Sequence, residues 1–403
     1  MIWVMAVFNP FVLSYKVNPY LQYGRLRAED PVHRSIAMQA WILTRYDDCI
    51  EVLRNPTTFS SDGRNAGGQL GEAIRQQQAE SPLGQAQTLL SSDPPAHTRM
   101  RAIVNRVFTP RRVESLRPRI EEIARDLLDA APFEGGFELM AGYAQPLPVI
   151  VIAELLGVPS ADRDRFKQWS NAMAATTDIM NSEAVINQAQ ETTLELIDYF
   201  GRFIAERRAA PQDDLISALV AAEEAEQLST DEILAFAILL LVAGNETTTN
   251  LIGNGTAILL DYPEVADELR AQPAEVPVAI EEMLRYDSPV QAVVRIARED
   301  IKLGGKAIDS GDVLMMMLGA ANHDGDQFDD PGEFRAERDP NRHLSFGMGP
   351  HFCLGAPLAR LEAEIAFTSL LACYASIGRG EGDAERGGTL LLRGLTKLPL
   401  AVA

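Results

Sequence analysis

Apolar side chains recur at helical spacing through the middle of the chain, from about residue 96 to 290. Ile120, Ile123 and Leu128, for example, share one face of a predicted helix, and charged residues lie largely on the opposite face. The middle of the chain is therefore predicted to be mainly helical.

Strand-like patterns lie mostly outside this helical region. Short apolar runs at residues 41–44 and 313–318 have the length and composition of strands. Residues 301–312 and 390–402 resemble hairpins, the second with Gly394 near its turn. Helices in the middle with small antiparallel pieces around them predict a mainly α fold of the α+β class.

The chain shows no linker that would divide it into domains. No Pro-, Gly- or Ser-rich stretch separates two patterned regions, so we expect a single domain spanning residues 1–403. Residues 60–92 and 165–195 lack strong apolar repeats and are predicted to be long, less regular segments. Segments of this length are often lids or binding loops, although plain surface explains the pattern equally well.

Charge and cysteine content exclude several classes of protein. The net charge of -21 argues against general nucleic-acid binding, which needs a basic surface. Cys49, Cys353 and Cys373 form no CxxC pair, which disfavours a disulfide framework or a zinc site and favours a reducing cytoplasm. No apolar run reaches the roughly 20 residues of a membrane span. We therefore expect a cytoplasmic protein with neither nucleic acid nor membrane as a partner.

One helix is predicted to cross the whole domain. Ser229 and Glu232 form a capping box, and the pattern continues to Asp261, just before a proline. A helix of this length extends about 45 Å. Its first half is apolar and must be core, but residues 243–250 combine glycine and threonine, which are poor helix formers.

The unusual middle of this helix has two interpretations. It is either a kink tolerated for packing or a groove in which the small residues Ala243 and Gly244 admit a ligand. In the second interpretation, Glu246 and Thr247 offer an acid and a hydroxyl for proton delivery. A carboxyl group midway along a buried helix is costly unless it is used.

Four basic residues from distant segments are candidates for an anion site. His97 and Arg101 share one face of a predicted helix, and Arg295 stands alone in an apolar strand-like run. A buried cation of that kind needs an anion. His351 lies two residues before Cys353. Each of the four is readily explained as structural on its own, and spacing alone does not show that they converge.

Two further features cannot be assigned a role from their local sequence alone. Glu282 and Arg285 share a helix face, a spacing that is common on protein surfaces. Cys353 precedes a predicted helix within SFGMGPHFCLG, where helix amides favour a thiolate. The thiolate could be a nucleophile with His351 as its base, or the single axial ligand of a haem.

Taken together, these motifs resemble those of the soluble bacterial cytochromes P450, which are haem-thiolate monooxygenases. The resemblance runs nearly end to end and is carried by four motifs in the right order: Phe346-x-x-Gly349-x-His351-x-Cys353-x-Gly355, Ala243-Gly-x-Glu-Thr-Thr248, Glu282-x-x-Arg285 and Asp93-Pro-Pro-x-His-x-x-x-Arg101. It implies the P450 fold, a helical core with a long central helix and small peripheral antiparallel sheets.

The resemblance also implies residue roles. Cys353 corresponds to the axial ligand of haem b, and Glu246 and Thr247 to the acid–alcohol pair that delivers protons during oxygen activation. The implied haem-propionate partners are His97, Arg101, Arg295 and His351. The implied structural ion-pair triad is Glu282, Arg285 and Arg338. The implied substrate-pocket residues are Leu239, Val242, Ala243, Gln291, Val294 and Leu392.

The implied reaction inserts one atom of O2 into a lipophilic small molecule. Electrons are expected from NAD(P)H through a separate ferredoxin and ferredoxin reductase, and the enzyme is expected to be a monomer. Residues 99–125 carry eight arginines against three glutamates, which suggests docking of an acidic ferredoxin there. Two alternatives are an H2O2-driven peroxygenase and a non-catalytic haem-binding or sensor protein.

Overall fold

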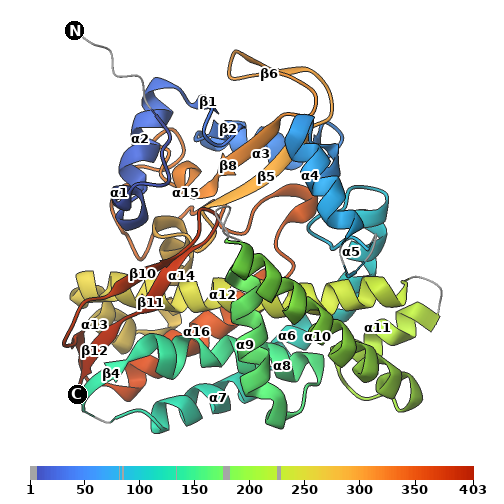
Figure 1. The fold of residues 1–403 in the computed structure, drawn as a ribbon. Helices are drawn as coiled ribbons and strands as arrows, with labels where there is room; N and C mark the ends of the chain where they lie inside the picture. The colour runs from blue at the N-terminus through green and yellow to red at the C-terminus, as the bar shows by residue number, and fades with distance from the viewer. Residues whose placement is uncertain (1–6, 81, 84–85, 133, 176–181, 225–227) are drawn as a thin grey trace.

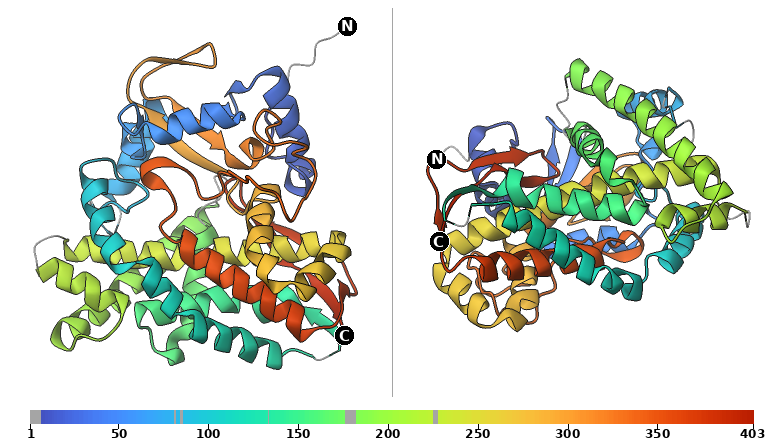
Figure 2. Two further views of the ribbon diagram at one scale, coloured as in Figure 1. Left: turned by 180° about the vertical axis from the view of Figure 1, so that it is seen from behind. Right: turned by 90° about the horizontal axis from the view of Figure 1, so that it is seen from below.

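The computed structural model describes the chain except for residues 1–6, 81, 84–85, 133, 176–181 and 225–227 (Figure 1). The predicted helical middle is confirmed, and its helices surround one long central helix (Figures 1 and 2). These helices are α5 (Ala96–Val107), α6 (Pro110–Ser115), α7 (Arg117–Asp129), α8 (Pro146–Leu156), α9 (Arg163–Ala174), α10 (Glu183–Ala209), α11 (Leu215–Glu224), α12 (Thr230–Asp261), α13 (Pro263–Ala271) and α14 (Val276–Tyr286). The remaining helices are α1 (Leu13–Val17), α2 (Tyr20–Glu29), α3 (Tyr46–Arg54), α4 (Gly68–Ala79), α15 (Leu318–Ala321) and α16 (Ala356–Cys373).

The largest sheet lies on the side of the molecule that holds the N-terminal helices (Figure 1). Its strands, in spatial order, are β1 (Val32–Ser35), β2 (Ala40–Leu43), β8 (Val313–Met317), β5 (Ala292–Ala297) and β3 (Phe59–Ser60). The pairs of this sheet are antiparallel, as expected, except that β2 and β8 run parallel with Ala40 opposite Val313. These two strands are distant in sequence, so no hairpin dictates their direction.

Of the two predicted hairpins, one is present in the smaller sheets and the other is not. β6 (Ile301–Leu303) and β7 (Lys306–Ile308) form the expected hairpin, with Gly304 and Gly305 at positive φ in its turn. The predicted hairpin over residues 390–402 is wrong. β11 (Arg393–Lys397) pairs instead with β10 (Glu385–Gly388), and β12 (Pro399–Val402) pairs with β4 (Gly135–Glu138) and β9 (Ile377–Arg379).

Gly394 explains why the second hairpin is not where the sequence predicts it. It lies inside β11, and a Cβ there would lie 1.8 Å from the side-chain oxygen of Asn250 on α12. The glycine permits close contact between β11 and α12 and does not form a turn. Only the tertiary structure reveals that requirement.

The two segments predicted to be irregular contain helices. Residues 60–92 include α4, and residues 165–195 include most of α9 and the start of α10; part of each segment lies outside the described residues. Gly71 is the buried residue of α4. A helix with so little apolar burial leaves almost no periodic signal in the sequence.

Helix α12 begins and ends as predicted. Ser229 accepts from the Glu232 amide, Glu232 accepts from the Ser229 amide, and the helix continues to Asp261. It packs against α8, α9, α14 and α16. By length and composition it could span a membrane, yet 56% of its most apolar window is buried inside the structure. We therefore describe α12 as a core helix. The interpretation of residues 1–403 as one domain stays a prediction.

Candidate active site

The segment before α16 forms a tight loop around Cys353. The loop lies between the β5–β8 sheet and α12 in two views (Figures 1 and 2). Gly349 has φ +73°, and a Cβ there would lie 2.4 Å from the Leu53 carbonyl oxygen at the end of α3. Only glycine therefore allows the loop to approach α3 so closely. The Cys353 amide donates to the Phe346 carbonyl at 2.9 Å and closes the loop.

The surroundings of Cys353 support a thiolate only in part. Burial raises the pKa of the Cys353 thiol, while the amides of Gly355 and Ala356 and the charge of Arg101 lower it. Those amides lie at the start of α16, where the helix dipole also favours negative charge. The site thus holds a thiol whose ionised form needs a further positive partner, such as a metal ion.

The structure brings together the four predicted basic residues. His97 and His351 have ring centroids 4.1 Å apart, and the charges of Arg101 and Arg295 both act on His97. His97 and Arg101 come from α5, Arg295 from β5, and His351 from the short helical turn Gly349–His351. Arg101 also acts on Cys353, so this basic cluster adjoins the thiol.

This basic cluster has no carboxylate partner of its own. Among the described residues, none of its four members forms an ion pair, and the buried Nε2 of His97 has no hydrogen-bond partner. Burial and neighbouring cations lower the pKa of His351 to about 3, and burial lowers that of Arg295 to about 10. The charge of Asp93 acts on His97 and Arg295, but its carboxylate pairs with Arg298 at 2.7 Å and not with a member of the cluster. The cluster therefore lacks the anion that would stabilise its charged form.

One face of α12 remains partly open in the middle of an otherwise buried helix. Ala243 is exposed, Thr247 is half-buried, and Thr247 Oγ1 donates to the Ala243 carbonyl at 2.8 Å. The buried Oε2 of Glu246 has no hydrogen-bond partner among the described residues, and burial raises the pKa of Glu246. Gly244 does not belong to this opening, because a Cβ there would meet Ile152 of α8 at 3.3 Å.

The small and polar residues in the middle of α12, which suggested a kink or a groove, thus have two separate roles. A Cβ at Gly253 would lie 2.8 Å from the sulfur of Met140, and a Cβ at Gly255 would lie 2.4 Å from the ring of Phe367. These glycines allow close packing against α12. The accessible face of the helix lies around Leu239, Val242, Ala243 and Thr247.

The predicted ion pairs form a buried network behind the cysteine loop. Arg285 and Glu282 are fully buried and make two hydrogen bonds of 2.7 Å. Arg338 donates to both Glu282 oxygens at 3.0 and 3.1 Å. The sequence did not reveal Asn341, whose amide also donates to Glu282 at 3.0 Å. Its neutral side chain gave no charge pattern by which it could be found.

A second network, which the sequence did not predict, supports the same loop. Glu281 binds Arg360 through hydrogen bonds of 2.7 and 2.8 Å, and its Oε2 lies 3.0 Å from His343 Nε2. Although burial acts in the opposite direction, these partners lower the pKa of Glu281 to about 2. The Arg360 guanidinium lies 4.6 Å from the ring centroid of Phe346. Since the Phe346 carbonyl accepts from the Cys353 amide, this network contacts the loop that carries the thiol.

The six predicted substrate-pocket residues lie in two different parts of the structure. Leu239, Val242 and Ala243 keep partial or full exposure on α12. The other three, Gln291, Val294 and Leu392, lie toward the N-terminal helices. Gln291 accepts from the Tyr23 hydroxyl at 3.0 Å and donates to the Ser288 carbonyl, and Leu392 lines the same cavity as Gln291.

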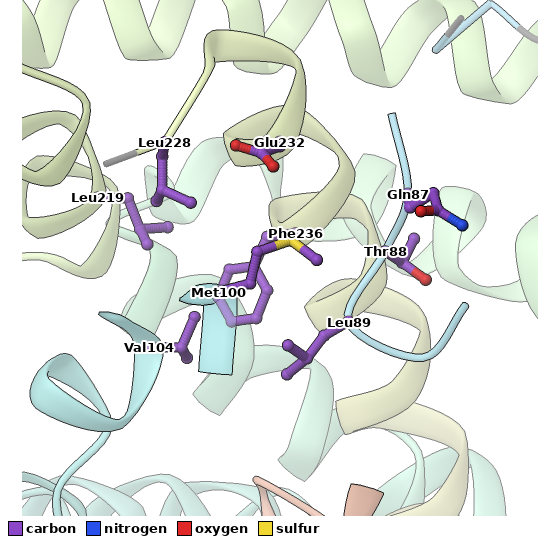
Figure 3. Close-up of a pocket in the computed structure, with 9 residues that line it drawn as sticks. All are labelled: Gln87, Thr88, Leu89, Met100, Val104, Leu219, Leu228, Glu232 and Phe236. Atoms are coloured by element: carbon purple, nitrogen blue, oxygen red, sulfur yellow. The ribbon is translucent and has the colours of Figure 1, made fainter. Parts of the chain in front are cut away.

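A small pocket at the start of α12 is not a substrate site. It lies where Met100, Val104, Leu219 and Phe236 converge from α5, α11 and α12 (Figure 3). Its cavity volume is about 10 Å³, which is near the minimum for one water molecule. The pocket contains none of the residues that the resemblance assigns to the substrate.

Comparisons with known proteins agree on the class of protein. The sequence model described as cytochrome P450 matches residues 166–377. The chain is 41% identical to the polyketide biosynthesis cytochrome P450 PksS of Bacillus subtilis, over 98% of this chain and 99% of that protein. It is also 41% identical to the vitamin D(3) 25-hydroxylase of Pseudonocardia autotrophica, over 96% and 94% of the two chains.

Solved structures show the same fold. The structure of PksS matches with a TM-score of 0.90 at 40% identity, covering 98% of this chain and 100% of that one. CYP109E1 of Bacillus megaterium, solved with testosterone, matches with a TM-score of 0.87 at 37% identity, covering 96% and 98%. The fold is therefore the P450 fold.

The chain belongs to the cytochrome P450 family. It is accordingly a monooxygenase, and membership of the family implies a haem cofactor.

Proposed function

We propose that the chain is a haem-thiolate monooxygenase that oxidises a lipophilic small molecule with electrons from separate ferredoxin-type partners. The observation that carries the proposal is the meeting of Cys353 with a basic cluster that lacks an anion. Bound haem supplies the activation of O2 and the transfer of one oxygen atom to a C–H or C=C bond.

The described residues fit this cofactor in both charge and chemistry. Cys353 would hold the metal as a thiolate, with the amides of Gly355 and Ala356 moderating its negative charge. The haem propionates would provide the anions that the basic cluster lacks, and the unpartnered Nε2 of His97 would gain a hydrogen-bond partner.

Glu246 and Thr247 would move protons in the site. Because burial raises the Glu246 pKa, this carboxyl group retains its proton to a higher pH than an exposed glutamate does. Its buried Oε2, which has no hydrogen-bond partner among the described residues, leaves Glu246 available as a proton donor beside Thr247. The Thr247 hydroxyl, which now donates to the Ala243 carbonyl, can rotate to accept or donate at the open face of α12.

The substrate is proposed to be lipophilic because the open part of α12 is lined by Leu239, Val242 and Ala243. Apolar side chains bind apolar ligands by removing both surfaces from water. Names among the relatives agree with this chemistry, since one is a vitamin D(3) hydroxylase and another was solved with testosterone. These names describe those proteins and motivate the screen proposed below.

The arginine-rich stretch at residues 99–125 is less basic in the structure than in the sequence. Four of its eight arginines pair with carboxylates outside the stretch, namely Glu232, Asp213, Glu364 and Glu154. Arg106, Arg111 and Arg125 are exposed and form no ion pair among the described residues. We place the ferredoxin-docking surface around Arg106 and Arg111, which remain exposed cations in this stretch.

We expect the double reversal Arg106→Glu and Arg111→Glu to slow reduction of the haem-loaded protein by reduced ferredoxin. The rate at low ionic strength should fall about tenfold or more, and its salt dependence should flatten, because charge steering is lost. Stopped-flow absorbance with a surrogate ferredoxin and its reductase measures the rate. Arg125→Glu on α7 is the matched control and should change the rate less than about twofold.

The same preparation tests the function itself. A compound library is screened for spectral shifts, and the compounds that bind are incubated with NAD(P)H, O2 and the redox partners, or with H2O2 alone. Product with the redox partners and little with H2O2 supports the proposal. Efficient product formation with H2O2 alone would favour a peroxygenase, and binding without any product would favour a haem-binding protein.

A further inference from the structure

Large apolar side chains gather on the surface of the N-terminal segment. Of the 13 large hydrophobic side chains exposed among the described residues, six lie between residues 7 and 21. We call these six the N-terminal patch: Val7, Phe11, Val12, Leu13, Val17 and Leu21. Single exposed apolar residues are ordinary, but a concentration of this kind marks an interaction surface.

The exposure of this patch is fixed by packing of α1. Tyr15 is the buried residue of α1, with its ring against Phe8 and Tyr23 and its hydroxyl 2.8 Å from that of Tyr23. With Tyr15 turned inward, Leu13 and Val17 face solvent, at 76% and 57% exposure. Helices α1 and α2 lie at the edge of the molecule (Figures 1 and 2). Packing of Tyr15 therefore holds the patch on the surface.

The patch is also cationic in a strongly acidic chain. Residues 7–28 contain Lys16, Arg25 and Arg27 and no aspartate or glutamate, whereas the whole chain has a net charge of -21. Lys16 and Arg25 are exposed and form no ion pair among the described residues, while Arg27 donates inward to the Ala320 carbonyl. Apolar side chains bordered by free cations complement an anionic surface that also accepts apolar groups.

A lipid bilayer fits this combination better than an acidic protein does. Protein interfaces are usually depleted in lysine and rich in well-packed aromatic anchors. Interfacial membrane segments instead combine Phe, Leu and Trp with Lys or Arg and few acidic residues. The cytoplasmic leaflet, which the expected location would face, is anionic.

We propose that the N-terminal patch binds peripherally to the surface of an anionic lipid bilayer. The apolar side chains enter the headgroup region, and Lys16 and Arg25 lie against lipid phosphates. Acidic regions elsewhere on the protein oppose this weakly, because charges more than about 8 Å from the membrane are screened at physiological ionic strength. The proposal revises our expectation of no membrane partner, which rested on the lack of a spanning segment.

A cavity beside the patch connects this surface with residues expected to meet the substrate. It has a volume of about 230 Å³ and is lined by Phe11 and Lys16 on one side and by Leu390 and Leu392 on the other, with Gln291 also lining it. A lipophilic molecule leaving the bilayer would reach this cavity first. Only this link to the substrate rests on the proposed function; bilayer binding does not.

Vesicle sedimentation tests the proposal with the full-length, haem-loaded protein. One set of vesicles is pure phosphatidylcholine, and the other is an equal mixture of phosphatidylcholine and phosphatidylglycerol. The wild-type protein should bind the anionic vesicles about tenfold more tightly than the neutral ones or better, since each cation contributes about fivefold. Because the assay requires no turnover, its result is independent of whether the protein oxidises anything.

Three variants locate the binding surface. Leu13→Ser with Val17→Ser should weaken binding to anionic vesicles about tenfold or more, and Lys16→Glu should do the same. The control Leu90→Ser, with 58% exposure close to that of Val17, should leave binding unchanged. Unchanged urea midpoints and haem content exclude misfolding. Absence of wild-type binding would overturn the proposal and leave the patch to a protein partner, and binding that the patch variants do not weaken would overturn it as well.

Discussion

Replacement of Glu282 by alanine is expected to destabilise the protein by about 3–5 kcal/mol and to prevent normal haem incorporation. Glu282 is fully buried and is the only carboxylate that pairs with Arg285 and Arg338 among the described residues. Its removal leaves the fully buried Arg285 guanidinium without a counter-charge. The backbone amide of Arg335, which also donates to Glu282, loses its acceptor at the same time.

The consequence should reach the haem site because this network holds the chain that leads into the cysteine loop. Arg285 also donates to the carbonyls of Asn322, Pro331 and Glu333. Urea unfolding and the ratio of haem to protein measure the two effects. Glu282→Gln keeps the shape and removes the charge, so it provides a milder variant if the alanine variant fails to fold.

Asp267→Ala is the control for this experiment. Asp267 pairs with Arg270 on the surface of α13 with 77% of its side chain exposed, so its loss should cost about 1 kcal/mol or less. A Glu282→Ala protein with the same stability as this control and a normal haem content would contradict the assigned role of the buried network.

Replacement of Thr247 by alanine is expected to separate NAD(P)H consumption from product formation. A positioned proton donor contributes about 10²-fold or more to a reaction that depends on it. Product formation should therefore fall by about that factor, while electrons continue to reduce O2 and leave as H2O2. Parallel measurement of NAD(P)H oxidation, H2O2 and product gives the coupling directly.

Thr256 provides a matched control on the same helix. Both threonines donate to the carbonyl four residues earlier at 2.8 Å, but Thr256 is buried at the end of α12 that packs against α14 and α16. Thr256→Ala removes the same helix contact without touching the open face. If both variants lose coupling equally, the effect lies in the helix backbone; if neither does, Thr247 is not the proton donor.

The elements that the sequence predicted best are those specified by local chemistry. The capping box at Ser229 fixes the start of α12. The paired glycines Gly304 and Gly305 likewise fix a hairpin turn. Each of these features depends on residues within one turn of each other, so the sequence carries the whole signal.

The elements that were mispredicted depend on distant partners. The parallel pairing of β2 with β8 joins strands from opposite ends of the chain. Gly394 is required by Asn250, which lies on another element. The arginines of residues 99–125 looked basic because their acidic partners, such as Glu232 and Glu154, lie elsewhere in the sequence. No window of sequence contains both members of such pairs.

The candidate site shows the same division. The motifs contain Cys353, three of the four basic residues and two members of the buried triad, because each motif combines an unusual residue with a fixed spacing, whereas Arg295 and Arg338 lie outside them. The side-chain direction of Gln291 was not predictable from the sequence. Its amide is held by two hydrogen bonds, one accepted from the hydroxyl of Tyr23 and one donated to the carbonyl of Ser288. Pocket residues depend on which way a strand faces, and the sequence near β5 is apolar on both faces.

The central claim is that Cys353 is the thiolate ligand of a bound haem. The most direct test is the absorption spectrum of the reduced protein with carbon monoxide, for the wild type, Cys353→Ser and the control Cys373→Ser. We predict the red-shifted band of thiolate-ligated haem in the wild type and in Cys373→Ser, and its loss in Cys353→Ser. A Cys353→Ser protein that keeps this band, or a wild-type protein that binds haem and lacks it, would contradict the assignment.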